Sequence, residues 1–171
     1  MSERKHPNVL NVSEANVRSM EKGTRFGFTA RMLGQATGAT GVGCTWYEVP
    51  PGRAAFPTHF HCANEEAIFV LEGEGSLRIG KDAVELRAGD YATLPPAPDH
   101  AHRLTNTGTT PLRYLCMSTL HKGAEVVGYP DSKKVAAMGV PQSWKFPEPA
   151  WIRMISREGS SLDYYDGEDV G

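Results

Sequence analysis

Short runs of apolar and β-branched residues, each ended by glycine or proline, succeed one another through the middle of the chain. Such runs predict β-strands, here over residues 42–49, 58–62, 66–71, 76–79, 83–86, 91–94, 101–106 and 112–118. The turns between them are equally regular, as in Pro50-Pro51-Gly52, Gly73-Glu74-Gly75 and Gly80-Lys81-Asp82. Many short strands with frequent turns predict an all-β sandwich or barrel, and closure into a barrel leaves no exposed sheet edge.

The segments on either side carry weaker patterns. Residues 1–24 are interpreted as an N-terminal arm, in which Ser13 is expected to cap one or two helical turns that reach Met20. We expect the barrel over residues 25–120 and a C-terminal extension that packs on it over 121–171. Outside the central strands, the pattern predicts a strand at 25–33, a loop at 34–43, a strand at 125–129, a helix at 131–138, an extended stretch at 144–151 and an edge strand at 151–156.

Composition and charge restrict the class of protein without identifying it. A chain of 171 residues with 40% hydrophobic and 22% charged residues suits one globular domain. The net charge of −2 gives no basic footprint for nucleic acid. No apolar run approaches the roughly 20 residues of a membrane helix, and the first residues lack the apolar core of a secretory signal. Three widely spaced cysteines argue against disulfides and favour the cytoplasm: Cys44, Cys62 and Cys116, all expected as buried strand residues.

The chemistry of the chain is concentrated around a pair of histidines. His59 and His61 alternate along a predicted strand, so their side chains share one face. Glu66 follows closely, and His102 comes from a distant strand. Three imidazole nitrogens and one carboxylate oxygen are the ligands that a divalent transition metal requires. The pair alone would be weak support, because two such histidines also occur on exposed strands.

The spacing around this pair resembles the first motif of the cupin superfamily. In that motif a glycine, His-x-His, a glutamate and a second glycine follow one another at set intervals. Here it reads Gly52, His59-Phe60-His61, Glu66 and Gly73, with one extra residue between Gly52 and His59. The resemblance implies a double-stranded β-helix, the jelly-roll barrel of cupins, with its core over about residues 40–120.

The second cupin motif is present in altered form. Gly89 and Pro95 match its start, but Ala97 replaces a glycine. Counting from the start of the motif selects His100 as its histidine, whereas counting back from Asn106 selects His102. We favour His102, because an insertion is tolerated better in the proline-rich loop than in a paired strand. This stretch, with Gly128-Tyr129-Pro130-Asp131 and the ending 163–168, also resembles a single-domain, uncharacterised bacterial cupin subgroup.

The resemblance implies that one divalent transition metal ion, Zn, Mn, Fe, Ni or Co, binds to His59, His61, Glu66 and His102. Glu65 competes with Glu66, and the six-residue gap to Gly73 favours Glu66. His100 shares strand parity with His102 and is the candidate catalytic acid or base. Its alternative is a solvent-exposed loop histidine. Asn106 is expected to hold a neighbouring loop rather than to touch substrate.

Two functions remain open on this scaffold, because fold does not decide function. The first is a metal-dependent enzyme that acts on a small organic molecule, by oxygenase, isomerase or lyase chemistry. The alternative is a non-catalytic cupin that binds or senses a small ligand. A homodimer is expected, with neither nucleic acid nor membrane as a partner.

Overall fold

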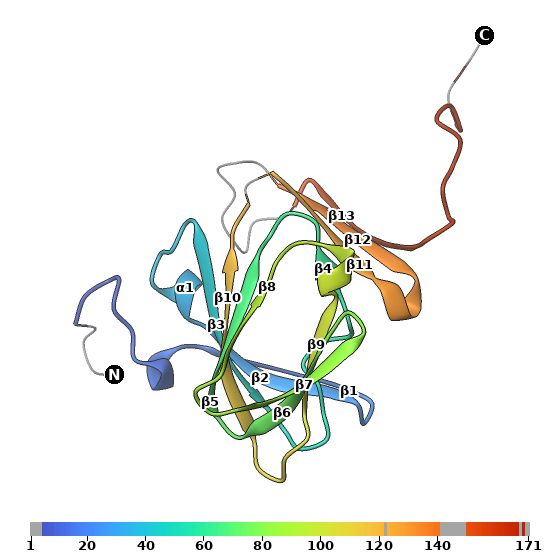
Figure 1. Ribbon diagram of the computed structural model, residues 1–171. Helices are drawn as coiled ribbons and strands as arrows, with labels where there is room; N and C mark the ends of the chain where they lie inside the picture. Colours follow the sequence, from blue (N-terminus) through green and yellow to red (C-terminus); the bar gives the residue numbers. More distant parts are fainter. Residues whose placement is uncertain (1–4, 122, 141–149, 168, 170–171) are drawn as a thin grey trace.

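The computed structural model describes residues 5–121, 123–140, 150–167 and 169, and these form three antiparallel sheets (Figure 1). The largest has the order β1 (Val17–Lys22), β2 (Phe26–Met32), β3 (Val42–Val49), β10 (Leu112–Thr119), β5 (Glu66–Glu72) and β8 (Tyr91–Leu94). The second comprises β7 (Asp82–Arg87), β6 (Glu74–Ile79) and β9 (His102–Asn106). The third comprises β13 (Ile152–Arg157), β12 (Lys134–Gly139), β11 (Ala124–Tyr129) and β4 (Phe60–His61).

The hydrophobic core lies between the strands of the first two sheets. Alternation along each strand turns every second side chain inward, as in β10, where Leu112 and Tyr114 are buried. In β5 the inward residues are Glu66, Ile68 and Val70, so that the apolar face carries a carboxylate at its first position. The side chains below 2% exposure include Val49, Val70, Leu77, Leu94 and Leu112. This core fixes the inward direction of Glu66.

One turn glycine is required by its surroundings. Gly73 joins β5 to β6 with a φ of 81°, in the left-handed region that favours glycine. A Cβ at this position would lie 2.7 Å from the carbonyl oxygen of Pro111. The glycine predicted to end the first motif is therefore needed for both the backbone conformation and the close approach of the loop before β10.

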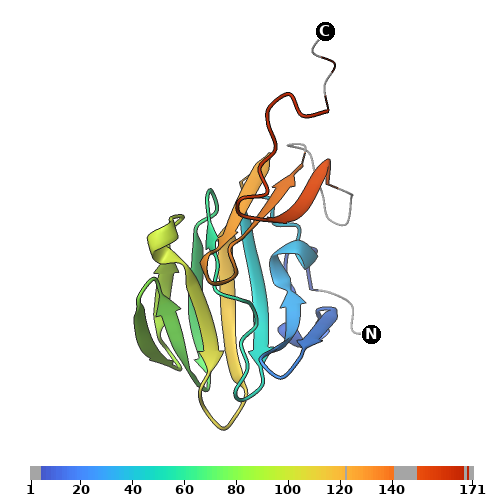
Figure 2. The same ribbon diagram turned by 90° about the vertical axis from the view of Figure 1, so that its right-hand side faces the viewer.

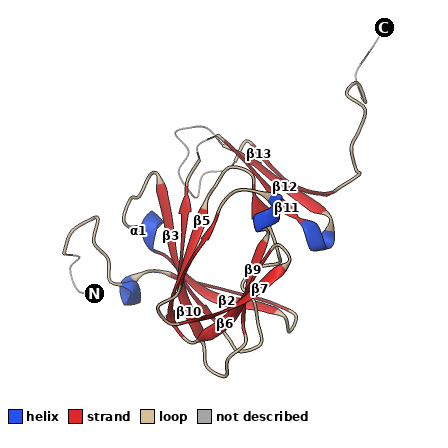
Figure 3. Cartoon of the chain, in the orientation of Figure 1, coloured by secondary structure: helices blue, strands red, loops and turns tan. Residues whose placement is uncertain are grey.

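The predicted strands are confirmed, and the all-β character of the chain with them (Figure 3). The helix predicted at 131–138 is wrong: a short 3₁₀ turn, η3 (Pro130–Ser132), leads into β12, which pairs with β11 and β13. Hydrogen bonding on both edges outweighs the helix propensity of its alanines. The extended stretch predicted at 144–151 lies, up to residue 149, outside the described residues.

The helical turns predicted from Ser13 to Met20 are also wrong. The 3₁₀ turn η1 (Val12–Glu14) is capped by Asn11, whose side chain accepts from Ser13 N. Strand β1 then begins at Val17 and pairs with β2, so residues 17–20 form part of a sheet and not of a helix. The predicted loop at 34–43 contains part of α1 (Leu33–Ala36). The division of the chain at residues 24 and 120 remains a prediction.

The C-terminal segment after β13 leads away from the sheets (Figures 1 and 2). Leu162, Tyr164 and Tyr165 in this segment are 75, 89 and 61% exposed. Within the described part of the chain, no helix has the length and apolarity to cross a bilayer.

Candidate metal centre

Three histidines and one glutamate meet at one site, although they come from separate stretches of the chain. His59 and His61 lie just before and on β4, Glu66 begins β5 and His102 begins β9. Paired backbone hydrogen bonds join two of these stretches: His102 N donates to His59 O at 2.8 Å, and His59 N donates to His102 O at 3.1 Å. This bridge places the histidine of the second motif beside the pair of the first.

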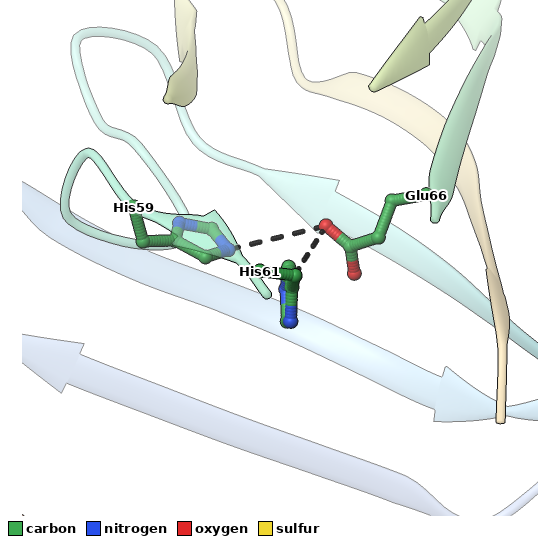
Figure 4. Close-up of side chains that lie close together, drawn as sticks. All are labelled: His59, His61 and Glu66. Atoms are coloured by element: carbon green, nitrogen blue, oxygen red, sulfur yellow. Dashed lines mark ion pairs between the residues drawn. The ribbon is translucent and has the colours of Figure 1, made fainter. Parts of the chain in front are cut away.

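The carboxylate of Glu66 is the meeting point of the imidazoles. Its Oε2 lies 3.1 Å from His102 Nε2, 3.5 Å from His61 Nε2 and 3.9 Å from His59 Nε2. Ligand atoms of His59, His61 and Glu66 all lie within 4.8 Å of one another, and Figure 4 shows both rings turned toward the carboxylate. The four side chains are only 7 to 17% exposed.

Backbone carbonyls fix the orientation of two of the rings. His59 Nδ1 lies 2.9 Å from Pro57 O, and His102 Nδ1 lies 3.0 Å from His100 O. A carbonyl oxygen only accepts, so each Nδ1 carries the hydrogen and a neutral ring presents the Nε2 lone pair to Glu66. Lone pairs and a carboxylate oxygen that face one another repel unless a proton or a metal ion lies among them. Rings held in this way are typical of metal-binding histidines.

His61 is the ring whose polar atoms lack partners. Both of its ring nitrogens are buried without a hydrogen bond. The nearest carboxylate oxygens, on Glu66 and Glu125, lie 3.5 Å from Nε2 and Nδ1, respectively, beyond the usual hydrogen-bond length. Buried polar atoms are rarely left without a partner. A metal ion bound to His61 Nε2 would give this atom the partner that the described protein atoms do not provide.

The electrostatics of the cluster suit a cation. Burial and the neighbouring His102 lower the pKa of His59 to about 4, so this ring is neutral near pH 7. Burial alone would raise the pKa of Glu66, but the neighbouring imidazoles of His102 and His61 hold it well below its usual range. Burial lowers the pKa of His61, and the charges of Glu66 and Glu125 outweigh this effect and raise it. A neutral ring beside an ionised carboxylate is the state that metal binding requires.

Residues 45–118 match the family model described as the cupin domain. The chain contains a cupin domain. The matched segment contains every residue of the cluster. The resemblance read from the first motif is thereby confirmed at the level of the superfamily.

Two curated relatives match part of the cupin. An uncharacterized protein of Methanocaldococcus jannaschii is 35% identical over 70 residues, 41% of this chain and 54% of that protein. Quercetin 2,3-dioxygenase of Bacillus subtilis is 32% identical over 76 residues, 44% of this chain and 23% of that enzyme. The chain thus spans about half the length of the first and about a quarter of the second.

Solved structures resemble the cupin over most of its length. A candidate sugar phosphate isomerase from Acidithiobacillus ferrooxidans is 25% identical with a TM-score of 0.69, covering 77% of this chain and 86% of that one. A cupin from Silicibacter pomeroyi described as a sugar phosphate isomerase is 20% identical with a TM-score of 0.74, covering 92% and 98%. These likenesses confirm the predicted double-stranded β-helix.

Glu125 is a residue of this site that the sequence did not reveal. It is 8% exposed at the start of β11, and it accepts hydrogen bonds from Cys62 N at 3.2 Å and Asn64 N at 3.0 Å. Its Oε1 also faces His61 Nδ1 at 3.5 Å. The carboxylate therefore anchors the turn that follows β4 and borders the ring of His61. A single glutamate at the start of a predicted strand carries no pattern from which this role can be read.

Aromatic rings border the site on the side of His59. Tyr129 stacks on the His59 ring with centroids 6.1 Å apart, and Phe56 meets the same ring edge-on at 6.1 Å. The Lys134 ammonium lies 5.0 Å from the centroid of Tyr129. These contacts limit rotation of His59 and provide an apolar border for a bound molecule.

The other candidate residues divide into separate groups. His100 lies in the 3₁₀ turn η2 (Pro98–His100), not in a strand, so the parity argument for its side chain is wrong. Its Nδ1 lies 3.2 Å from Pro95 O, and its carbonyl oxygen lies 3.0 Å from His102 Nδ1.

Glu65 is exposed, whereas Glu66 faces the histidines. Asn106 is fully buried and donates to Val49 O and Thr110 O, which confirms its expected role in holding a loop.

The cysteines are less buried than predicted. Cys62 is exposed, because β4 ends at His61 and leaves the next residue in a turn, and Cys44 and Cys116 are half-buried. All three are free thiols.

Proposed function

We propose that His59, His61, Glu66 and His102 bind one divalent transition metal ion, and that the cupin is a metal-dependent enzyme acting on a small organic molecule. The observation that carries this proposal is the convergence of the Nε2 atoms on Glu66 Oε2 within 3.1 to 3.9 Å. Carbonyl contacts at Nδ1 of His59 and His102 support it, because they direct lone pairs to the same point. The ligand set is compatible with Zn, Mn, Fe, Ni or Co.

The chain's own residues define what such a site does. When bound, the ion supplies Lewis acidity or redox chemistry to a small substrate. Glu66 contributes the negative charge among the ligands, and the buried surroundings strengthen its interaction with a cation. Tyr129 and Phe56 border His59 and keep water away from that side. His100 remains the proposed acid or base; it is half-buried and lies two residues before the strand that carries His102.

Oxygenase and isomerase chemistry are the reaction types to test first. One relative is a quercetin dioxygenase and one structural neighbour is a candidate sugar phosphate isomerase. Both names support an enzyme with a small organic substrate. Partial coverage of the dioxygenase, 23% of its length, leaves the substrate itself open.

We further propose a cytoplasmic homodimer. The free cysteines support a reducing compartment. Exposed apolar side chains on β13, the edge strand of its sheet, support pairing between copies: Ile152, Met154 and Ile155, which are 58, 52 and 67% exposed. Light scattering of the purified protein measures the oligomeric state, and a monomer across the accessible concentration range would exclude the dimer.

Metal analysis of protein prepared without chelators tests the centre. We expect close to one ion per chain in the wild type and in the His121→Ala control, which removes an exposed histidine, and strong loss in His59→Ala and His102→Ala. Equal metal content in the wild type and His59→Ala would overturn the assignment. If His100→Ala loses the metal and His102→Ala keeps it, His100 would replace His102 as the third histidine ligand.

Turnover assays on the loaded protein then separate enzyme from binder. Oxygen uptake with quercetin and isomerisation of sugar phosphates followed by NMR are the assays indicated by the relatives. Turnover that is lost in His59→Ala supports the enzyme. A molecule that binds tightly in calorimetry but is returned unchanged would favour the small-ligand binding alternative.

A further inference from the structure

The second oxygen of Glu66 has a partner of its own. Whereas Oε2 faces the imidazoles, Oε1 lies 3.7 Å from the Sγ atom of Cys116. This distance is within the reach of a hydrogen bond to sulfur, which is longer than one between oxygen and nitrogen. The two oxygens of one carboxylate are thus assigned to two different environments.

The sheet register explains why Cys116 reaches this oxygen. In β10, Cys116 lies opposite Ile68 of β5 and Thr45 of β3. Ile68 is two residues beyond Glu66 on the inward face of β5, so Cys116 is a diagonal neighbour of the carboxylate. Its side chain packs against the hydrophobic core below the site.

The direction of the hydrogen bond follows from the chemistry of its partners. An ionised carboxylate has no hydrogen to give, so the thiol donates. A thiol that donates to a carboxylate in this way is a hydrogen-bond donor rather than a nucleophile or a metal ligand.

We propose that Cys116 is a positioning residue: its S–H group engages Glu66 Oε1 and thereby presents Oε2 alone to the ion. This inference rests on the proposed function. A carboxylate held in this way would offer one oxygen, rather than both, to a bound ion. Without the thiol, both oxygens of Glu66 are free to turn toward the cation.

Infrared spectroscopy of the metal-free protein tests the hydrogen bond directly. The difference spectrum between the wild type and Cys116→Ala isolates the S–H stretching band of this residue. We expect a band lowered in frequency relative to a free thiol, which returns to higher frequency in Glu66→Gln because an amide accepts more weakly. A band at the free-thiol frequency, or one unmoved by Glu66→Gln, would overturn the proposal.

Cobalt titration tests the consequence for the ion. We expect about tenfold weaker Co²⁺ binding in Cys116→Ala, the lower range for loss of an outer partner of a ligand, with a changed visible absorption spectrum. Cys116→Ser is expected to restore both, because a hydroxyl also donates. The control is Cys44→Ala: Cys44 lies opposite Met117, the residue after Cys116, so its side chain is on the other face.

The outcomes separate this role from the proposed function. Equal affinity and spectrum in the wild type and Cys116→Ala would overturn the positioning role and leave the metal centre intact. Identical defects in Cys116→Ser and Cys116→Ala would assign the effect to packing and also overturn it. A wild type that fails to bind Co²⁺ or any of the other four metals would overturn both proposals.

Discussion

The ring of Phe60 lies directly against the backbone of Gly128. The two residues are paired between β4 and β11, and a Cβ at position 128 would overlap Phe60 Cε1. Phe60 separates His59 from His61, so the space left by this glycine holds the strand that carries both histidines. The absent side chain in β11 therefore helps to position His59 and His61, two of the proposed metal ligands.

Replacing this glycine is expected to disturb the metal centre from outside it. Gly128→Ala should destabilise the fold by about 1–3 kcal/mol, the usual effect of overpacking, and should weaken metal binding because Phe60 must shift. Thermal unfolding with and without metal measures both effects. The matched control is Gly139→Ala in β12, where a Cβ would meet its nearest atom, Ile152 Cβ, at an ordinary 3.6 Å. Identical behaviour of the two variants would contradict the role of Gly128.

Glu66→Gln is expected to separate stability from metal binding. The substitution removes the negative charge among the ligands, so we expect affinity to fall by more than about 100-fold, beyond the range for outer partners. The new amide can donate to the Nε2 lone pair of His102, which lies 3.1 Å from the present oxygen. The metal-free variant should therefore unfold at the same temperature as the wild type or higher.

Differential scanning calorimetry with and without added metal measures this separation. Glu65→Gln, an exposed neighbour, serves as the control and should keep the metal-induced stabilisation. A Glu66→Gln protein that is stabilised by metal as strongly as the wild type would remove Glu66 from the ligand set.

Glu125→Ala is expected to impair both the fold and the centre. Loss of the carboxylate leaves the backbone N–H groups of Cys62 and Asn64 without its hydrogen bonds. Cys62 N keeps its hydrogen bond to Val126 O, but loss of a hydrogen bond to a charged acceptor costs about 1.5–3 kcal/mol. Loss of the charge beside His61 Nδ1 should weaken metal binding by about 10–100-fold. Chemical denaturation and metal titration measure the two effects. Glu158→Ala, at an exposed position, is the control and should change neither stability nor metal affinity. A Glu125→Ala protein with the stability and metal affinity of the wild type would show that Glu125 does not hold the turn.

The central strands and the proposed ligand residues were predictable from the sequence because both depend on local patterns. The alternation at 42–49 and 91–94 is bounded by proline and glycine, and the structure forms β3 and β8 over these same residues. The motif that fixed Glu66 over Glu65 depends only on spacing. By contrast, the alanines of 134–139 have no local strand signal, and β12 forms because β11 and β13 hydrogen-bond to both of its edges.

The supporting residues of the site depend on register, which the sequence leaves undetermined. Glu125 borders His61 only because β11 pairs with β4, and Cys116 reaches Glu66 only because β10 pairs with β5. A one-residue shift of the first pairing would turn Glu125 to the opposite face, and a one-residue shift of the second would do the same to Cys116. The proposed ligands therefore follow from a motif, whereas the residues that orient them can be recognised only in the fold.

Acid is expected to destabilise the metal-free protein through His59. Burial and the nearby His102 lower the pKa of His59 from 6.5 to about 4, so between these values the unfolded chain binds the proton and the folded chain does not. Stability contributed by this group is present above pH 6.5, is lost as the pH falls, and is fully lost below pH 4, a change of about 3 kcal/mol from the shift alone. The raised pKa of His61 acts in the opposite direction and reduces the total. Urea unfolding of the metal-free protein across this pH range measures the slope, and His59→Gln should make it shallower. A His59→Gln protein with the slope of the wild type would contradict the buried, neutral state of this ring.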